Sequence, residues 1–259
     1  MSGRFSQSQI GNMSWGMAMP ETIKHRVGLL IPSSNTNVEP EYYSVMPASV
    51  SVHFARLTMT SVDDEGLTRQ DDDVTRQAEL LATAGVEIIL FCQVAASFYH
   101  GLEYDTKLRM RIENASGKPA ITAAQTTIDA LNVLGARSIS IASPFTPEVY
   151  NISSAFLTAN GFDVLAVEGL GYVDNYSIAL IEYDTVRDMV RRSDHPDAEV
   201  IVILGGNMPC LLIADELERE LGKPVITTNQ TGIWALLRHL GGFQGLTGMG
   251  QLLRKHLAS

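Results

Sequence analysis

The sequence has few of the residues that build disulfide frameworks and metal centres. Its 259 residues include two cysteines, Cys92 and Cys210, and six histidines. Two cysteines cannot make a disulfide framework in a chain of this length, so we expect a reducing, cytoplasmic location. No two histidines have the spacing of metal ligands, which argues against a metal site.

Long apolar runs and an excess of positive charge are also lacking. No stretch reaches the roughly 18 apolar residues that indicate a membrane-spanning helix, so no membrane partner is expected. Residues 1–24 contain no continuous apolar core of the signal-peptide type, and we interpret them as an N-terminal arm. The formal net charge of −10 argues against nucleic acid as a partner, because its binding needs a basic face.

The sequence does contain apolar β-type runs that alternate with helical stretches. Strands that are apolar throughout and alternate with helices are typical of a parallel sheet covered on both faces. The predicted fold class is therefore α/β. The predicted strands are residues 26–32, 50–57, 86–91, 118–122, 138–143, 163–168, 199–204 and 223–227; the predicted helices are 71–85, 103–116, 123–134, 148–160, 181–192, 211–221 and 230–240.

An internal repeat divides the chain into two similar halves. "GKPAITAAQTTIDALNVLG" (117–135) matches "GKPVITTNQTGIWALLRHLG" (222–241) at most positions. We predict α/β halves at 25–136 and 137–245 and a C-terminal tail at 246–259. Duplication for stability alone would leave the same pattern. The functional alternative is a cleft between the halves, where the turns after the strands meet.

The turns expected at this cleft suit a small carboxylate. "PSSN" (32–35) offers Ser and Asn side chains and free amides at the start of a helix. "QVAAS" (93–97) and "GGNMP" (205–209) are turns of mostly small residues that can present backbone N–H groups to an anion. A plain helix cap is the other interpretation of the first turn.

The two cysteines differ in their predicted positions. Cys92 follows a strand, and Cys210 lies near a predicted helix start, where a thiolate is favoured. Free cysteines also often pack in the core without any chemistry. Because side chains alternate along a strand, Cys92 and Gln93 cannot both face the cleft.

In their order, "VGLLIPSSNTNVEPEYY", "LFCQVAASFYHG", "IASPFTPEVY", "ILGGNMP" and the second repeat resemble the aspartate/glutamate racemase superfamily. Within it, they are most similar to maleate cis-trans isomerases and arylmalonate decarboxylases. The resemblance covers about residues 26–245. It implies two α/β halves related by pseudo-twofold symmetry with the active site between them, no cofactor, and a dimer or tetramer of identical chains.

The resemblance also assigns site residues. It places carboxylate binding at Ser33, Ser34 and Asn35 and the first catalytic cysteine at Cys92 or Gln93. The second cysteine position falls on Leu204 or Gly205, and Phe145 stands in place of a tyrosine. The full set of predicted site residues is Cys92 and Gln93 as catalytic residues; Pro32, Ser33, Ser34, Asn35, Val94, Ala95, Phe145, Gly205, Gly206 and Asn207 as substrate-binding residues; and Tyr99, His100, Tyr104 and Cys210 as further candidates.

Three interpretations of function follow. In the first, Cys92 is the single working thiol of an isomerase or decarboxylase that passes through an enolate-like intermediate. In the second, the cleft is rebuilt for another lyase, hydrolase or isomerase reaction that uses residues such as Tyr99, His100, Tyr104 or Asn207. In the third, the protein binds a small carboxylate without turning it over. The first is preferred, and it leaves open whether the chemistry is isomerisation or decarboxylation.

Overall fold

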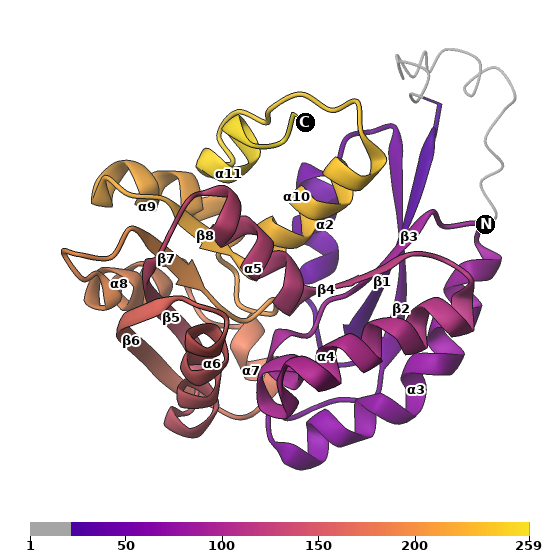
Figure 1. Ribbon diagram of the computed structural model, residues 1–259, viewed down its shortest axis with the longest axis horizontal. Helices are drawn as coiled ribbons and strands as arrows, with labels where there is room; N and C mark the ends of the chain where they lie inside the picture. Colours follow the sequence, from indigo (N-terminus) through magenta and orange to yellow (C-terminus); the bar gives the residue numbers. More distant parts are fainter. Residues whose placement is uncertain (1–21, 259) are drawn as a thin grey trace, which may run out of the picture.

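Two sheets, each of four parallel strands, organise the part of the chain that the computed structural model describes, residues 22–258 (Figure 1). The first sheet has the order β2-β1-β3-β4 and the second the order β6-β5-β7-β8. The predicted α/β fold of two similar halves is confirmed, whereas most of the expected N-terminal arm lies outside the described residues. The strands are β1 (His25–Pro32), β2 (Val50–Leu57), β3 (Ile88–Phe91), β4 (Ala120–Thr122), β5 (Ser138–Phe145), β6 (Asp163–Tyr172), β7 (Val200–Ile203) and β8 (Val225–Thr227).

The central strands explain why the sheets form. β3, "IILF", and β7, "VIVI", are buried along their whole length, as expected for strands covered on both faces. The helices around them are α2 (Val38–Val45), α3 (Asp64–Thr83), α4 (Val94–Ser116), α5 (Ala123–Val133), α6 (Pro147–Ala159), α7 (Asn175–Ala179), α8 (Tyr183–Ser193), α9 (Ala214–Leu221), α10 (Thr228–Leu240) and α11 (Gly250–Lys255), with a short 3-10 helix η1 (Leu211–Ile213) before α9.

The sequence repeat appears in the structure as a repeated helix start. Thr122 caps α5 and Thr227 caps α10, and each side-chain oxygen accepts from the amide of a glutamine three residues on. α5 and α10 lie side by side between the halves (Figure 1). Thr126 and Thr231 join them through their buried hydroxyls, whose oxygens are 3.1 Å apart. The repeat therefore forms part of the junction between the halves.

Several helix boundaries differ from the prediction. α4 begins at Val94, where the Gln93 side chain caps it, and not at residue 103. Gly101, with φ of 85°, kinks the helix just before the predicted start. α3 begins at Asp64, capped by Asp63. No helix was predicted at α2, α7 or α11, which have at most eight residues each. The expected C-terminal tail contains α11, whose Leu252 and Leu253 are fully buried.

Within the described residues, no helix combines the length and apolarity needed to cross a membrane.

The halves are also joined by a pair of backbone hydrogen bonds between two loops. The amide of Val62 donates to the Val173 carbonyl at 2.9 Å, and the amide of Asn175 donates to the Thr60 carbonyl at 2.9 Å. These bonds hold the segment before α7 against the loop that follows β2.

A buried carboxylate in α4 gives a prediction about pH. Asp105 is 4% exposed, and its Oδ2 accepts from the Thr122 hydroxyl at 2.9 Å, whereas Oδ1 has no partner among the described residues. Burial raises the pKa of Asp105 above its usual range. A carboxyl whose pKa is higher in the folded state favours folding at low pH, and this contribution is lost as pH rises through that pKa.

We expect Asp105→Asn to gain stability relative to wild type as pH rises from 4 to 8. The change should be no steeper than about 1.4 kcal/mol per pH unit, the limit for one proton. Urea unfolding of both proteins at several pH values measures it. A stability difference that does not vary with pH would contradict the assignment.

Candidate active site

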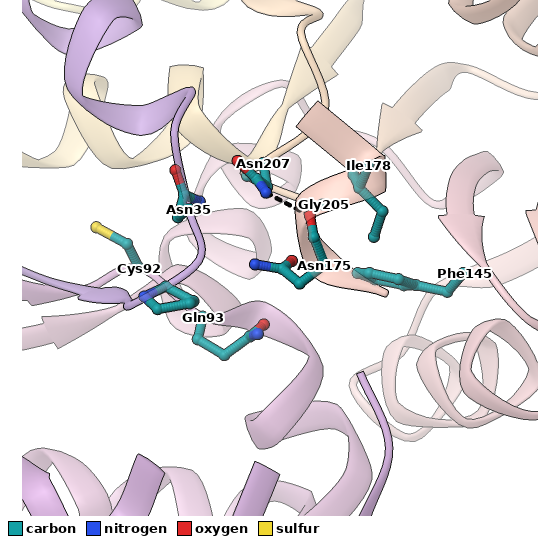
Figure 2. A pocket seen from close by; sticks show the side chains of 10 residues that line it. Asn35, Cys92, Gln93, Phe145, Asn175, Ile178, Gly205 and Asn207 are labelled. Carbon is teal, nitrogen blue, oxygen red and sulfur yellow. Dashed lines mark hydrogen bonds between the residues drawn. The ribbon is translucent and has the colours of Figure 1, made fainter. Parts of the chain in front are cut away.

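A small cavity lies between the carboxyl ends of the two sheets, where ligands of α/β proteins usually bind (Figure 2). Its volume of about 10 Å³ is room for a single water molecule. A carboxylic acid therefore needs the walls to separate before it can enter. The lining residues are Pro32 and Asn35 after β1, Cys92 and Gln93 after β3, Phe145 at the end of β5, Asn175 and Ile178 in α7, and Gly205, Gly206 and Asn207 after β7.

Strand register identifies equivalent positions in the two halves. The amide of Cys92 donates to the Leu30 carbonyl at 2.9 Å, and the amide of Leu204 donates to the Ala142 carbonyl at 2.9 Å. Leu30 and Ala142 occupy corresponding places in β1 and β5, opposite the last residues of β3 and β7. Cys92 therefore corresponds to Leu204, and Gln93 corresponds to Gly205.

Gln93 directs its side chain away from that of Cys92 and toward the side of Asn175 and Phe145 (Figure 2). Its Oε1 accepts from the amide of Ala95 at 2.8 Å, which fixes the orientation of the side-chain amide. The Nε2 group is 3.1 Å from the sulfur of Met59. Because a thioether is a weak acceptor, this buried N–H₂ group keeps donor capacity for a ligand.

Cys92 lines the cavity, but its sulfur points away from Asn175, Gly205 and Asn207 (Figure 2). The Sγ atom is 3.8 Å from the carbonyl oxygen of Leu90. Burial raises the pKa of this thiol well above its usual range, and the hydroxyl of Tyr42 offsets this only partly. As placed here, the group is a buried neutral thiol rather than a nucleophile directed at the cavity.

Asn35 supplies a second donor. Its Oδ1 accepts from the amides of Asn37 at 3.0 Å and Val38 at 2.9 Å, so Nδ2 is the end left without an acceptor among the described residues. The backbone amides of Gly206 and Asn207 likewise have no acceptor within residues 22–258. From the part of the chain that the structure describes, no charged side chain lines the cavity. Neutral donors with spare capacity are suited to an anion.

Two asparagines join the walls of the cavity across the halves. Asn207 accepts from the amide of Thr36 at 3.0 Å through Oδ1, and its Nδ2 donates to the carbonyl of Asn175 at 2.6 Å. The Nδ2 of Asn175 donates in turn to the Ser34 hydroxyl at 2.8 Å. Asn207 was predicted as a site residue, whereas Asn175 and Ile178 were not. The signal that could have indicated them is "DN" (174–175), a helix cap after a strand.

Other predicted residues lie outside the cavity lining. The hydroxyls of Ser33 and Ser34 donate to the Met59 carbonyl, and Val94 and Ala95 are buried at the start of α4. Tyr99 lines a separate hollow beside Asp64 and Glu148. The remaining candidates are His100, which packs between Tyr99 and Tyr104; Tyr104, whose hydroxyl bonds to Asp71; and Cys210, which is buried with its amide on Glu41.

Across the described part of the chain, no three His, Cys, Asp or Glu side chains gather as metal ligands would. The donors that do converge come from both halves and from three separate turns. Asn35 and Gln93 belong to the first half, and Gly206 and Asn207 belong to the second. An anion placed between them would contact both halves.

Comparisons with known proteins find relatives that match most of the chain. The maleate isomerase of Pseudomonas putida is 27% identical over 242 residues, 88% of this chain and 97% of that protein. The arylmalonate decarboxylase of Bordetella bronchiseptica is 25% identical over 218 residues, 83% of this chain and 90% of that protein. The structure of a cysteine-to-serine mutant of Nocardia farcinica maleate cis-trans isomerase, with a covalently bound succinylcysteine intermediate, has a TM-score of 0.85 and 27% identity, covering 89% of this chain and 98% of that chain.

The resemblance seen in the sequence is thus confirmed over most of the chain. The profile of the arylmalonate decarboxylase family matches residues 27–253, which include every strand except the first two residues of β1. The relatives that match include both an isomerase and a decarboxylase. The chain belongs to the arylmalonate decarboxylase family.

Proposed function

We propose that this protein decarboxylates a malonate-type acid through an enolate-like intermediate, with no cofactor and no thiol at the reacting carbon. The observation that carries the proposal is the outward orientation of the Cys92 sulfur, while Gln93, Gly206 and Asn207 line the cavity and the backbone amides of the last two have no acceptor within the described residues. Such donors stabilise the negative charge that develops in a transition state.

The proposed step needs only these groups. One carboxylate of the acid leaves as CO₂ when its bond to the α-carbon breaks, and the electron pair of that bond stays on the α-carbon. The charge spreads onto the remaining carboxylate, which receives hydrogen bonds from Asn35, Gln93 and the turn 205–207. A water molecule then protonates the α-carbon and leaves hydroxide. Phe145, Ile178 and Pro32 supply apolar surface for the substituent on that carbon.

Maleate-type isomerisation is the second candidate, and the succinylcysteine intermediate in the Nocardia farcinica enzyme favours it. Isomerisation through such an adduct needs a thiol that can attack a double bond. In this chain, the Cys92 sulfur would have to turn into the cavity and lose its proton.

The cytoplasmic location and homo-oligomeric state expected from the sequence stay predictions.

The deciding experiment is proton NMR in D₂O with wild type and Cys92→Ala. The panel holds phenylmalonate, vinylmalonate, maleate, aspartate and glutamate. We expect wild type to convert a malonate into the α-deuterated monoacid, and Cys92→Ala to keep turnover within about threefold of wild type, because Cys92 contributes only core packing. Loss of roughly 10²-fold or more, the effect of removing an acid–base group, would instead place the thiol at the reacting carbon.

Other outcomes separate the remaining interpretations. Maleate converted to fumarate by wild type but not by Cys92→Ala would establish isomerisation through the thiol. Line broadening of one acid with no product from any would favour a protein that binds carboxylates without turnover. Either result would overturn the proposed decarboxylation.

A further inference from the structure

Glu41 is a buried acid in the first half whose carboxylate accepts three hydrogen bonds from the second half. It lies in α2 and is 4% exposed. Its Oε1 accepts from the amides of Cys210 and Leu211, each at 3.1 Å. Its Oε2 accepts from Nδ2 of Asn229 at 2.7 Å. The carboxylate therefore links the two halves through hydrogen bonds.

The burial of Glu41 is costly. No cation pairs with it anywhere in residues 22–258, so hydrogen bonds alone compensate for its loss of water. Burial raises its pKa, and the donors Asn229, Leu211 and Cys210 act in the opposite direction. An apolar side chain would pack at such a position without this cost. The carboxylate must therefore be explained by what it holds in place.

The groups that Glu41 binds lie at both ends of the turn that lines the cavity. Cys210 and Leu211 follow the turn directly. Asn229 binds the other end, because the same Nδ2 also donates to the carbonyl of Gly206 at 2.9 Å. The contact is close: a Cβ on Gly206 would be 2.8 Å from Oδ1 of Asn229. Glu41 thus fixes residues 206–211 from the opposite half.

The same helix contacts the cavity at its other end. Asn35, a cavity residue, accepts the amides of Asn37 and Val38 at the start of α2. Between them, the amide of Thr36 donates to Oδ1 of Asn207. Two contacts therefore join the donors of one half to those of the other. One is made by Thr36, which precedes α2, and the other by Glu41 within α2.

We propose that Glu41 is a positioning residue of the active site: it holds residues 206–211 so that the amides of Gly206 and Asn207 face the developing anion. This rests on the proposed function, in which those amides stabilise the intermediate. Glu41 does not line the cavity, and it acts through Asn229 and the backbone.

Glu41→Gln is the primary test. Its amide oxygen can still accept from Cys210 and Leu211, but its Nε2 then meets Nδ2 of Asn229, so two donors face each other. Asn229 must turn away and release the Gly206 carbonyl. We expect kcat to fall about 10- to 100-fold with KM within threefold, in line with the loss of part of an oxyanion site.

The matched control is Glu218→Gln. Glu218 is also a buried carboxylate that accepts two amides, from Val225 at 3.2 Å and Gln251 at 2.7 Å, but it is not among the residues that line the cavity. The Glu218→Gln variant should lose stability and keep the kinetic constants of wild type. Asn229→Ala should reproduce the kinetic effect of Glu41→Gln, and the double variant should show less than the product of the two losses, because both act on one contact chain.

A readout without substrate separates this inference from the proposed function. The ¹H–¹⁵N resonances of Gly206 and Asn207 should shift in Glu41→Gln and stay in place in Glu218→Gln. If no protein turns over any acid, the decarboxylation fails while the shifts still decide the role of Glu41. Unchanged resonances, or a wild-type kcat in Glu41→Gln, would overturn the positioning role.

Discussion

Gln93→Glu is expected to lose turnover by a factor of about 10²–10³, the usual effect of removing one oxyanion donor. The substitution keeps the length of the side chain and its acceptor for the Ala95 amide. A carboxylate at the start of α4 suits the helix dipole, but Gln93 is buried, so desolvation of the charge should lower the thermal midpoint. What changes is the Nε2 donor, which is replaced by a negative oxygen at the site of the anion.

Steady-state rates on the malonate found by NMR, with thermal unfolding alongside, measure this effect. Gln93→Leu is the companion variant: it removes the donor and the helix cap together, so it should lose similar activity and about 1 kcal/mol of stability. If Gln93→Glu keeps activity within threefold of wild type, Gln93 is not a donor to the intermediate. The search would then return to Cys92.

Gly205→Ala is expected to lower the free energy of unfolding by about 2–4 kcal/mol, the sum of a left-handed backbone and a steric clash. Gly205 has φ of 96°, and an added Cβ would lie 2.7 Å from Cγ and 3.0 Å from Cδ of Pro144. Pro144 lies within β5 and has little freedom to move. The turn would be displaced from the cavity, so turnover should fall by at least about tenfold, as one misplaced oxyanion donor implies.

Gly161→Ala separates backbone strain from the clash. Gly161 has φ of 90°, close to that of Gly205, but a Cβ there meets no atom within 4 Å. Gly161→Ala should lower the free energy of unfolding by about 1–2 kcal/mol and leave turnover unchanged, because only the strain of the left-handed backbone applies. Chemical denaturation of both variants gives the comparison. Equal stability loss in the two, with full activity in both, would show that the Pro144 contact has no role.

The sheets could be predicted because their signal is local. β3 and β7 are continuous apolar runs, and the repeated "GKP" segments lead into β4 and β8 with the same threonine caps. α2, α7 and α11 could not be found in this way. They are short, and α11 is held by packing of Leu252 and Leu253 rather than by a strong helical pattern.

Four of the five segments that line the cavity were predicted, because they follow strands or continue from strand ends. The choice between Cys92 and Gln93 depended on which of two adjacent side chains faces the cleft. A shift of one residue in matching the family motif reverses that choice, so the sequence alone could not decide it. Asn175 was missed because its partners, Ser34 and Asn207, are far away in the chain. Contacts of that kind arise only after the halves have packed.

The pairing of Gln93 with Gly205 has a consequence for stereochemistry. An enolate is planar, and a repeated frame presents equivalent positions to its two faces. Here one position carries an amide side chain and the other carries only a hydrogen on a left-handed backbone. The two faces of the intermediate thus meet different surroundings, one occupied and one bare. In the reaction proposed above, water would reach the α-carbon from the side of Gly205, and one enantiomer of the product would predominate.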